Sequence, residues 1–177
     1  MTALPRSEPI RALDLGPAVP ENFAFLAGAA GRIQILDALR DTLDPGFAIR
    51  SLKKLAPELE YTFHLVLMWD YLNYLTPDQS SNLVEAITPL CRPDARCLAI
   101  VYSAETMPAR PVKYRVADRG NLIYERSTTD LIGAPQLTPA AVEAVLDGFS
   151  IEHAFVLRNG VREYVAVRDA ASKMNRG

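Results

Sequence analysis

The residues from Phe63 to Trp69 form the strongest apolar run in the chain, and this run constrains the fold more than any other segment. Six of its seven residues are apolar, and only His64 interrupts it. The run is too short for a membrane helix, which needs about 18 apolar residues. An apolar run of this length without alternation is typical of a strand buried on both faces in a parallel sheet. We therefore expect an α/β chain, and we interpret His64 as a hydrogen-bonded core residue.

The start of the chain predicts a strand, a helix and a second strand within about thirty residues. The first apolar run, Ile10 to Leu15, is stopped by Gly16 and Pro17, which favours a buried strand over a helix. A helical pattern follows at residues 23–27, and a second strand is expected at residues 32–37. This order is the βαβ unit from which parallel sheets are built.

The rest of the chain continues with alternating elements and ends in a hairpin. Thr76 begins a helix with a capping box that Gln79 completes, and Thr138 begins another. Two apolar strands flank Asn159 and Gly160, which is a strong hairpin signal. The other elements expected are a short helix at 49–55 ended by Pro57, a strand at 97–102 that begins after Arg92, Pro93 and Asp94, and a hairpin at 114–116 and 122–124. The fold predicted is α/β: a Rossmann-like, mostly parallel sheet with helices on both faces and a C-terminal antiparallel hairpin.

The length of 177 residues fits one domain, which we place at residues 10–167 between a flexible segment at 1–9 and a frayed one at 168–177. The formal net charge of -2 argues against nucleic-acid binding, because such domains are usually basic. Cys91 and Cys97 lie too far apart for a CxxC pair, so we expect two reduced thiols and no metal site. No signal peptide or membrane helix is expected, and we place the protein in the cytoplasm.

One turn has the residue types of a ligand site at the end of a parallel strand. Asp14 and Gly16, followed by Pro17 and Ala18, resemble the first motif of the class I S-adenosylmethionine-dependent methyltransferases. The resemblance implies that this turn passes close to the methionine part of the cofactor, with Asp14 orienting its amino group. It also implies that Asp37, at the end of the second strand, accepts hydrogen bonds from the ribose hydroxyls, as in dinucleotide-binding folds.

The segment from Phe63 to Leu75 is similar to the fourth motif of that family, where a central strand ends beside the reacting methyl group. The resemblance implies that Trp69 packs on the adenine or lines the substrate pocket; the alternative is that Trp69 belongs to the core. Candidate residues for positioning the methyl acceptor follow the strand, although they could also simply pack a helix start: Asp70, Tyr71, Asn73 and Tyr74.

Two functions remain open. The first is transfer of a methyl group from S-adenosylmethionine to a small-molecule or protein acceptor. The second is a catalytically inactive methyltransferase-like subunit that acts as an interaction or regulatory partner. It is motivated by Ala18 and Pro20 at the family's later glycine positions and by the lack of room for its third motif between Asp37 and Phe63. Exposed aromatic side chains from Tyr114 to Tyr124 would then form an interface, and an uncovered sheet edge favours a homodimer or heterocomplex. A nucleotide-binding reductase is a third reading, but its GxGxxG turn is absent.

Overall fold

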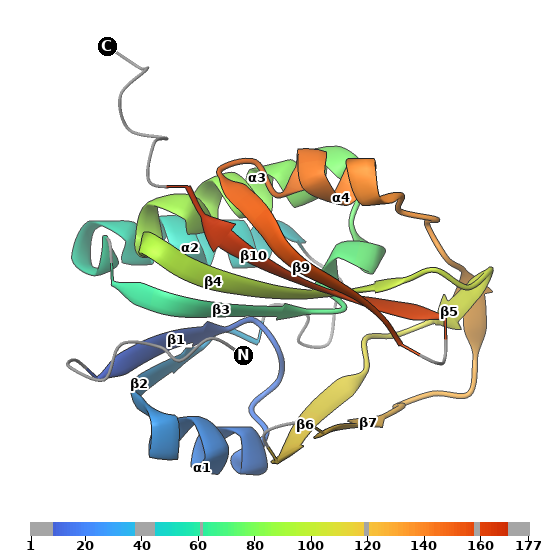
Figure 1. Ribbon diagram of the computed structural model, residues 1–177, viewed down its shortest axis with the longest axis horizontal. Coiled ribbons are helices and arrows are strands. Elements are labelled where there is room, and N and C mark those ends of the chain that lie inside the picture. The colour runs from blue at the N-terminus through green and yellow to red at the C-terminus, as the bar shows by residue number, and fades with distance from the viewer. Residues whose placement is uncertain (1–8, 38–44, 61, 119–120, 158–159, 170–177) are drawn as a thin grey trace.

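We describe the protein from a computed structural model, which describes residues 9–37, 45–60, 62–118, 121–157 and 160–169 (Figure 1). Most of the two tails predicted to be flexible or frayed, at 1–9 and 168–177, lies outside these residues. The last strand continues through Arg168, which is buried.

The largest element is a six-stranded sheet with the order β2-β1-β3-β4-β10-β9. Strands β2, β1, β3 and β4 are parallel, and β10 is antiparallel to both of its neighbours. The strands are β1 (Ile10–Asp14), β2 (Ala30–Ile35), β3 (Phe63–Trp69), β4 (Cys91–Tyr102), β9 (Phe149–Leu157) and β10 (Val161–Arg168). The mostly parallel sheet and the C-terminal antiparallel hairpin are confirmed.

Helices cover both faces of this sheet, as predicted. On one face, α2 (Pro45–Leu59), α3 (Pro77–Ile87) and α4 (Pro139–Val145) form a layer, while α1 (Pro20–Ala29) lies on the opposite side (Figure 1). The capping box at Thr76 is present, with the Gln79 amide N–H donating to its hydroxyl. Short 3-10 helices precede and follow α3: η1 (Tyr71–Tyr74) and η2 (Thr88–Leu90).

Alternation along β3 divides the core into two parts. Val66 and Met68 face the layer of α2, α3 and α4, where most of the buried residues lie. Leu67 and Trp69 face the other side, against α1 and a small hairpin. That hairpin consists of β6 (Lys113–Asp118) and β7 (Asn121–Glu125), and it covers the second part of the core.

Three local features differ from the sequence-based expectations. Helix α2 starts at Pro45, before the expected range, and continues two residues past Pro57, although that proline has no N–H for the helix hydrogen bonds. Strand β4 starts at Cys91, since the residues before its expected start form a bulge within the strand, with Asp94 at a φ of 71°. A short pair, β5 (Thr106–Pro108) with β8 (Leu131–Gly133), has no clear sequence signal.

The C-terminal hairpin is joined to the end of β4 by its turn. Gly160 has a φ of 66°, and a Cβ there would lie 2.8 Å from the Cβ of Ala104. Its carbonyl accepts hydrogen bonds from the amides of Ser103 and Ala104, at 2.7 and 3.1 Å. Glycine is required for both the left-handed backbone and the close approach. Asn159 lies outside the described residues.

Candidate functional site

The C-terminal ends of β1 and β3 meet at the point where the sheet changes direction. The chain leaves β1 toward β2 on one side and later returns to β3 on the other. The Leu15 amide donates to the Leu67 carbonyl across this junction, at 3.0 Å. In open α/β sheets, such a junction is where ligands bind, beyond the carboxyl ends of the strands. The sequence-predicted residues Asp14, Gly16, Trp69 and Asp70 all converge here.

Asp14 ends β1 with its carboxylate turned back onto the glycine turn. Its Oδ1 accepts one hydrogen bond from the Gly16 amide, at 2.9 Å, and one from Trp69 Nε1, at 2.7 Å. The residue is only 2% exposed. Burial raises the pKa of Asp14, the bonds from Trp69 and Gly16 lower it, and the nearby charge of Asp37 raises it.

Trp69 lies directly over the glycine turn. A Cβ at Gly16 would be 2.7 Å from Trp69 Cδ1, so a larger residue here would have to displace the indole. The indole stacks on the ring of Tyr114 from β6, with centroids 5.3 Å apart and planes at 4°. Trp69 also has a φ of 49°, which is a strained conformation for a bulky residue. The packing on Gly16, the stack on Tyr114 and the hydrogen bond to Asp14 together hold this side chain in place.

The remaining residues predicted to bind the cofactor border the same edge. Pro17 is half-buried and Ala18 is exposed in the turn between β1 and α1. Asp37 lies two residues beyond β2 and is half-buried. It is close enough to Asp14 for its charge to act on that carboxyl. This edge of the sheet thus carries two neighbouring carboxyl groups, those of Asp14 and Asp37, beside a glycine whose backbone the Trp69 indole approaches closely.

Asp70 is a second buried carboxyl, next to Trp69. Its Oδ2 accepts a hydrogen bond from the Val112 amide, at 3.0 Å, and one from the Tyr102 hydroxyl, at 3.4 Å. Burial raises the pKa of Asp70 from 3.8 to about 7, against the lowering effect of these hydrogen bonds. A carboxyl with a pKa near neutrality can give up or accept a proton under ordinary conditions.

Tyrosine hydroxyls surround this carboxyl. Burial and the Asp70 charge raise the pKa of Tyr102 to about 12 and also raise the pKa of Tyr74 and Tyr114. The Tyr74 hydroxyl donates to the Pro108 carbonyl at 3.0 Å. These phenols are therefore protonated near neutral pH and act as hydrogen-bond donors.

Asn73 and Tyr71, two of the residues predicted to position the methyl acceptor, make contacts that stabilise the fold. Asn73 Nδ2 donates to the carbonyls of Asp70 and Ile100, both at 2.8 Å, and its Oδ1 accepts from the Tyr102 amide at 2.9 Å. This side chain joins η1 to β4. Tyr71 is 2% exposed and belongs to the core beneath the helix layer, on the other side of the sheet from Trp69.

Sequence reasoning missed the contribution of the β6–β7 hairpin. Tyr114 was expected to be exposed, but it is 8% exposed because it stacks on Trp69, whereas Tyr124 is 46% exposed. The buried side chain of Asn22 connects α1 to β6. Its Nδ2 donates to the Tyr114 carbonyl and its Oδ1 accepts from the Val116 amide, both at 2.7 Å. No local motif links these residues, since they lie far apart in the sequence.

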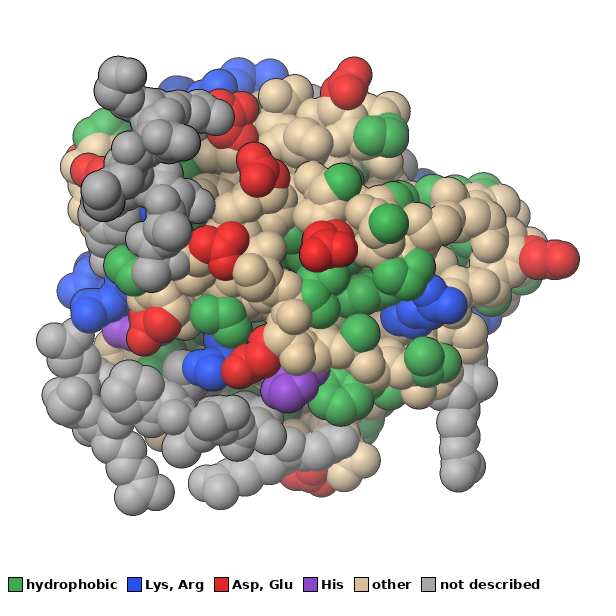
Figure 2. All heavy atoms as spheres, turned by 45° about the horizontal axis from the view of Figure 1, so that its top comes forward, with side chains coloured by type: hydrophobic (Ala, Val, Ile, Leu, Met, Phe, Trp, Pro, Cys, Tyr) green, Lys and Arg blue, Asp and Glu red, His purple; other side chains and the backbone are tan. Residues whose placement is uncertain are grey.

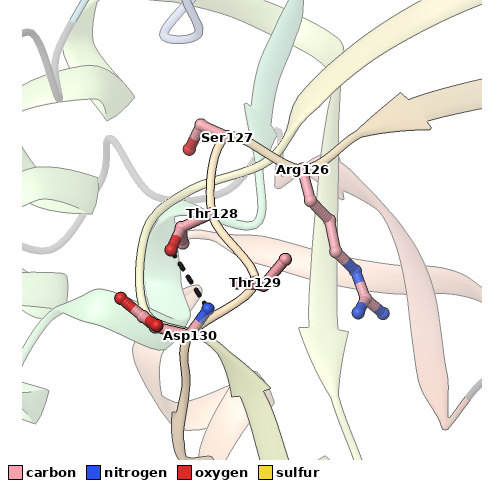
Figure 3. Close-up of a pocket in the computed structure, with 5 residues that line it drawn as sticks. All are labelled: Arg126, Ser127, Thr128, Thr129 and Asp130. Atoms are coloured by element: carbon pink, nitrogen blue, oxygen red, sulfur yellow. Dashed lines mark hydrogen bonds between the residues drawn. The ribbon is translucent and has the colours of Figure 1, made fainter.

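A separate hollow of about 530 Å³ lies in the loop between β7 and β8 (Figure 3). It is lined by Arg126, Ser127, Thr128, Thr129 and Asp130, and the Arg126 side chain points away from Ser127, Thr128 and Asp130. The Asp130 amide donates to Thr128 Oγ1 at 3.0 Å. The charge of Arg126 acts to lower the pKa of Tyr102, so this hollow adjoins the tyrosines around Asp70.

Cys91 and Cys97 are buried free thiols, as predicted, and burial raises the pKa of both, that of Cys91 to about 12. Within the described ranges, no cluster of three His, Cys, Asp or Glu could hold a metal ion. No helix in the part of the chain that the structure covers is long and apolar enough to cross a membrane.

Comparison by sequence finds no matching family model and no matching curated protein. Comparison of the fold finds solved structures of methyltransferases. An S-adenosylmethionine-dependent methyltransferase from Mesorhizobium loti matches with a TM-score of 0.59 and 17% identity, over 93% of this chain and 94% of that one. The 1,6-didemethyltoxoflavin-N1-methyltransferase of Burkholderia thailandensis, solved with S-adenosylhomocysteine, matches at 0.53 and 19%, over 91% and 72%. The N-methyltransferase NodS of Bradyrhizobium japonicum, also solved with S-adenosylhomocysteine, matches at 0.51 and 10%, over 90% and 78%. The chain has the fold of the class I methyltransferases, at low sequence identity.

Proposed function

We propose that the chain binds S-adenosylmethionine at the C-terminal ends of β1, β2 and β3 and transfers its methyl group to a small-molecule or protein acceptor. The observation that carries this proposal is the pair of carboxylates, Asp14 and Asp37, beside the Gly16 turn on a methyltransferase fold. A fold alone does not establish an activity, so the residues must account for the ligand.

The residues at this edge fit the chemistry of the cofactor. A carboxylate can bind its ammonium group, a second carboxylate can bind its ribose hydroxyls, and glycine admits the backbone to close approach. In the proposed site, Asp14 binds the amino group and Asp37 the ribose, while Gly16, Pro17 and Ala18 line the methionine part. The Trp69 indole lies against the Asp14 carboxyl group and Gly16.

The cofactor, when bound, supplies an activated methyl group on a sulfonium, so positioning contributes most of the rate. The acceptor loses a proton as its oxygen or nitrogen takes the methyl group. We assign the acceptance of that proton to Asp70, because its pKa is raised to about 7. Tyr74 and Tyr102 position the acceptor in this proposal, Asn73 holds η1 in place, and Tyr71 supports it from the core.

Calorimetric titration with S-adenosylmethionine and S-adenosylhomocysteine tests the proposal. We expect micromolar binding that Asp37→Ala weakens tenfold or more, equivalent to about 1.4 kcal/mol. The matched control is Asp130→Ala, an exposed aspartate outside the site. Absence of heat and of any thermal shift at millimolar cofactor would contradict the proposal.

A second candidate function is a catalytically inactive subunit that binds another protein, and the exposed edge strand favours it. Phe155, Val156 and Leu157 of β9 are 51%, 76% and 42% exposed at the end of the sheet. Figure 2 shows hydrophobic side chains exposed among acidic ones on one face of the molecule. Uncovered apolar edges favour association, either as a homodimer or in a heterocomplex. Light scattering across a wide concentration range, with Val156→Lys as the edge variant, tests association: a monomer throughout would argue against the homodimer.

A further inference from the structure

We propose that Trp69 is a displaceable plug of the cofactor site: its indole occupies one carboxylate oxygen of Asp14 and the space over Gly16, and cofactor binding requires it to leave. This inference rests on the proposed function, since it concerns the same site. It differs from direct cofactor contact by Trp69, which the sequence resemblance implied.

The first argument is competition for one atom. Trp69 Nε1 donates to Asp14 Oδ1 at 2.7 Å, and the Gly16 amide already donates to that same oxygen at 2.9 Å. A carboxylate oxygen has about two lone-pair sites, and the two bonds fill those of Oδ1, so an ammonium group that binds this oxygen competes with the indole. The indole therefore takes the position of the ligand's own donor.

The second argument is competition for space. The indole atoms Cδ1 and Nε1 lie 2.7 and 2.8 Å from where a single Cβ on Gly16 would be. With the indole in this position, a ligand chain cannot pass over Gly16 in the direction in which a Cβ would point. The glycine, whose lack of a side chain suits close approach by a ligand, is here approached by Trp69 itself.

The third argument is that the plug can be released. Trp69 has a φ of 49°, a conformation that costs a bulky residue free energy and is kept only by surrounding contacts. Those contacts are the Asp14 hydrogen bond and the stack on Tyr114, which itself belongs to the β6–β7 hairpin. Release of the indole breaks the stack on Tyr114, so cofactor binding and the position of the hairpin are coupled.

The test compares the affinity of S-adenosylhomocysteine, measured by calorimetry, for the wild-type protein and for Trp69→Phe. Phenylalanine keeps a ring against Tyr114 but removes the donor to Asp14, so it weakens the closed state selectively. If only a fraction of molecules is open, the apparent affinity is reduced by that fraction. We expect Trp69→Phe to bind at least tenfold tighter than the wild type.

A second variant, Tyr114→Leu, and the emission of Trp69 test the plug without relying on the Trp69→Phe substitution alone. Tyr114→Leu loosens the plug from the other side and is expected to tighten binding in the same direction, whereas Phe155→Leu, on the distant strand β9, is expected to leave it unchanged. Trp69 is the only tryptophan, so its emission reports its own surroundings. We expect the emission maximum of the wild type to move to longer wavelength on addition of S-adenosylhomocysteine.

The outcomes separate the plug from the proposed function. Tighter binding by Trp69→Phe together with the emission shift supports the plug. Equal or weaker binding by Trp69→Phe overturns the plug while the proposed function stands, because Trp69 would then be neutral or a direct cofactor contact. Binding by neither protein overturns both, since removal of the indole donor would not have opened a site.

Discussion

Replacing Asp70 by asparagine should change how the stability of the protein depends on pH. In the folded protein the pKa of Asp70 is raised from 3.8 to about 7, mainly by burial. The folded state therefore holds this proton more tightly than the unfolded chain. The resulting stabilisation is fully present below about pH 4 and is lost as pH rises through about 7. At about 1.4 kcal/mol per pH unit, the loss is roughly 4 kcal/mol.

Urea unfolding followed by circular dichroism at pH 4.5 to 8.5 measures this effect. Asparagine keeps an oxygen that can accept from the Val112 amide but does not titrate in this range. The contributions of the other titrating groups to the free energy of unfolding cancel when the two proteins are compared at each pH. We expect the free energy of unfolding of the wild type, relative to Asp70→Asn, to fall by about 3 kcal/mol over this range, which begins above the ordinary pKa of 3.8. Parallel curves would refute the reasoning, because Asp70 would then not be a buried carboxyl of raised pKa.

Three further predictions concern the site and the core. Asn22→Ala removes two hydrogen bonds to the backbone of β6 and should lower the free energy of unfolding by about 1–3 kcal/mol in urea titrations, whereas Asn121→Ala, whose bonds to Asp118 are exposed to solvent, should lower it less. Gly16→Ala should cost about 1–3 kcal/mol by overpacking against Trp69 and should red-shift its emission; an unchanged spectrum would contradict the contact. Cys91 and Cys97 should resist a thiol reagent at pH 8 until the protein unfolds, because burial raises the pKa of both; rapid labelling of the native protein would count against this.

The parts of the fold that local sequence encodes were predictable. The apolar run at 63–69 is β3, the capping box at Thr76 begins α3, and the residues around Gly160 form the terminal hairpin. In each case the signal lies within a few neighbouring residues, so periodicity or turn chemistry is enough. The same holds for Asp14 and Gly16, because Gly16 and Pro17 directly after an apolar run indicate where β1 ends.

The remainder depended on contacts between residues that are distant in the sequence. The stack of Trp69 on Tyr114 and the two bonds from Asn22 to β6 bring together three separate segments. No propensity or spacing encodes such a meeting. The bulge at Asp94 was missed for a related reason: a proline followed by an aspartate has the chemistry of a turn, and only pairing with β3 extends the strand through it.

The place of β10 has a consequence for how the chain reaches its native state. Strand β10 joins β4 to β9 but is synthesised after both of them. Until it emerges from the ribosome, β4 has an open edge and β9, with its apolar residues Phe155 to Leu157, has no partner in this sheet. The sheet can be completed only when β10 pairs with β4, which is distant in the sequence. This late pairing slows folding and leaves apolar segments exposed to other chains. We expect nascent or truncated chains that lack β10 to be chaperone clients.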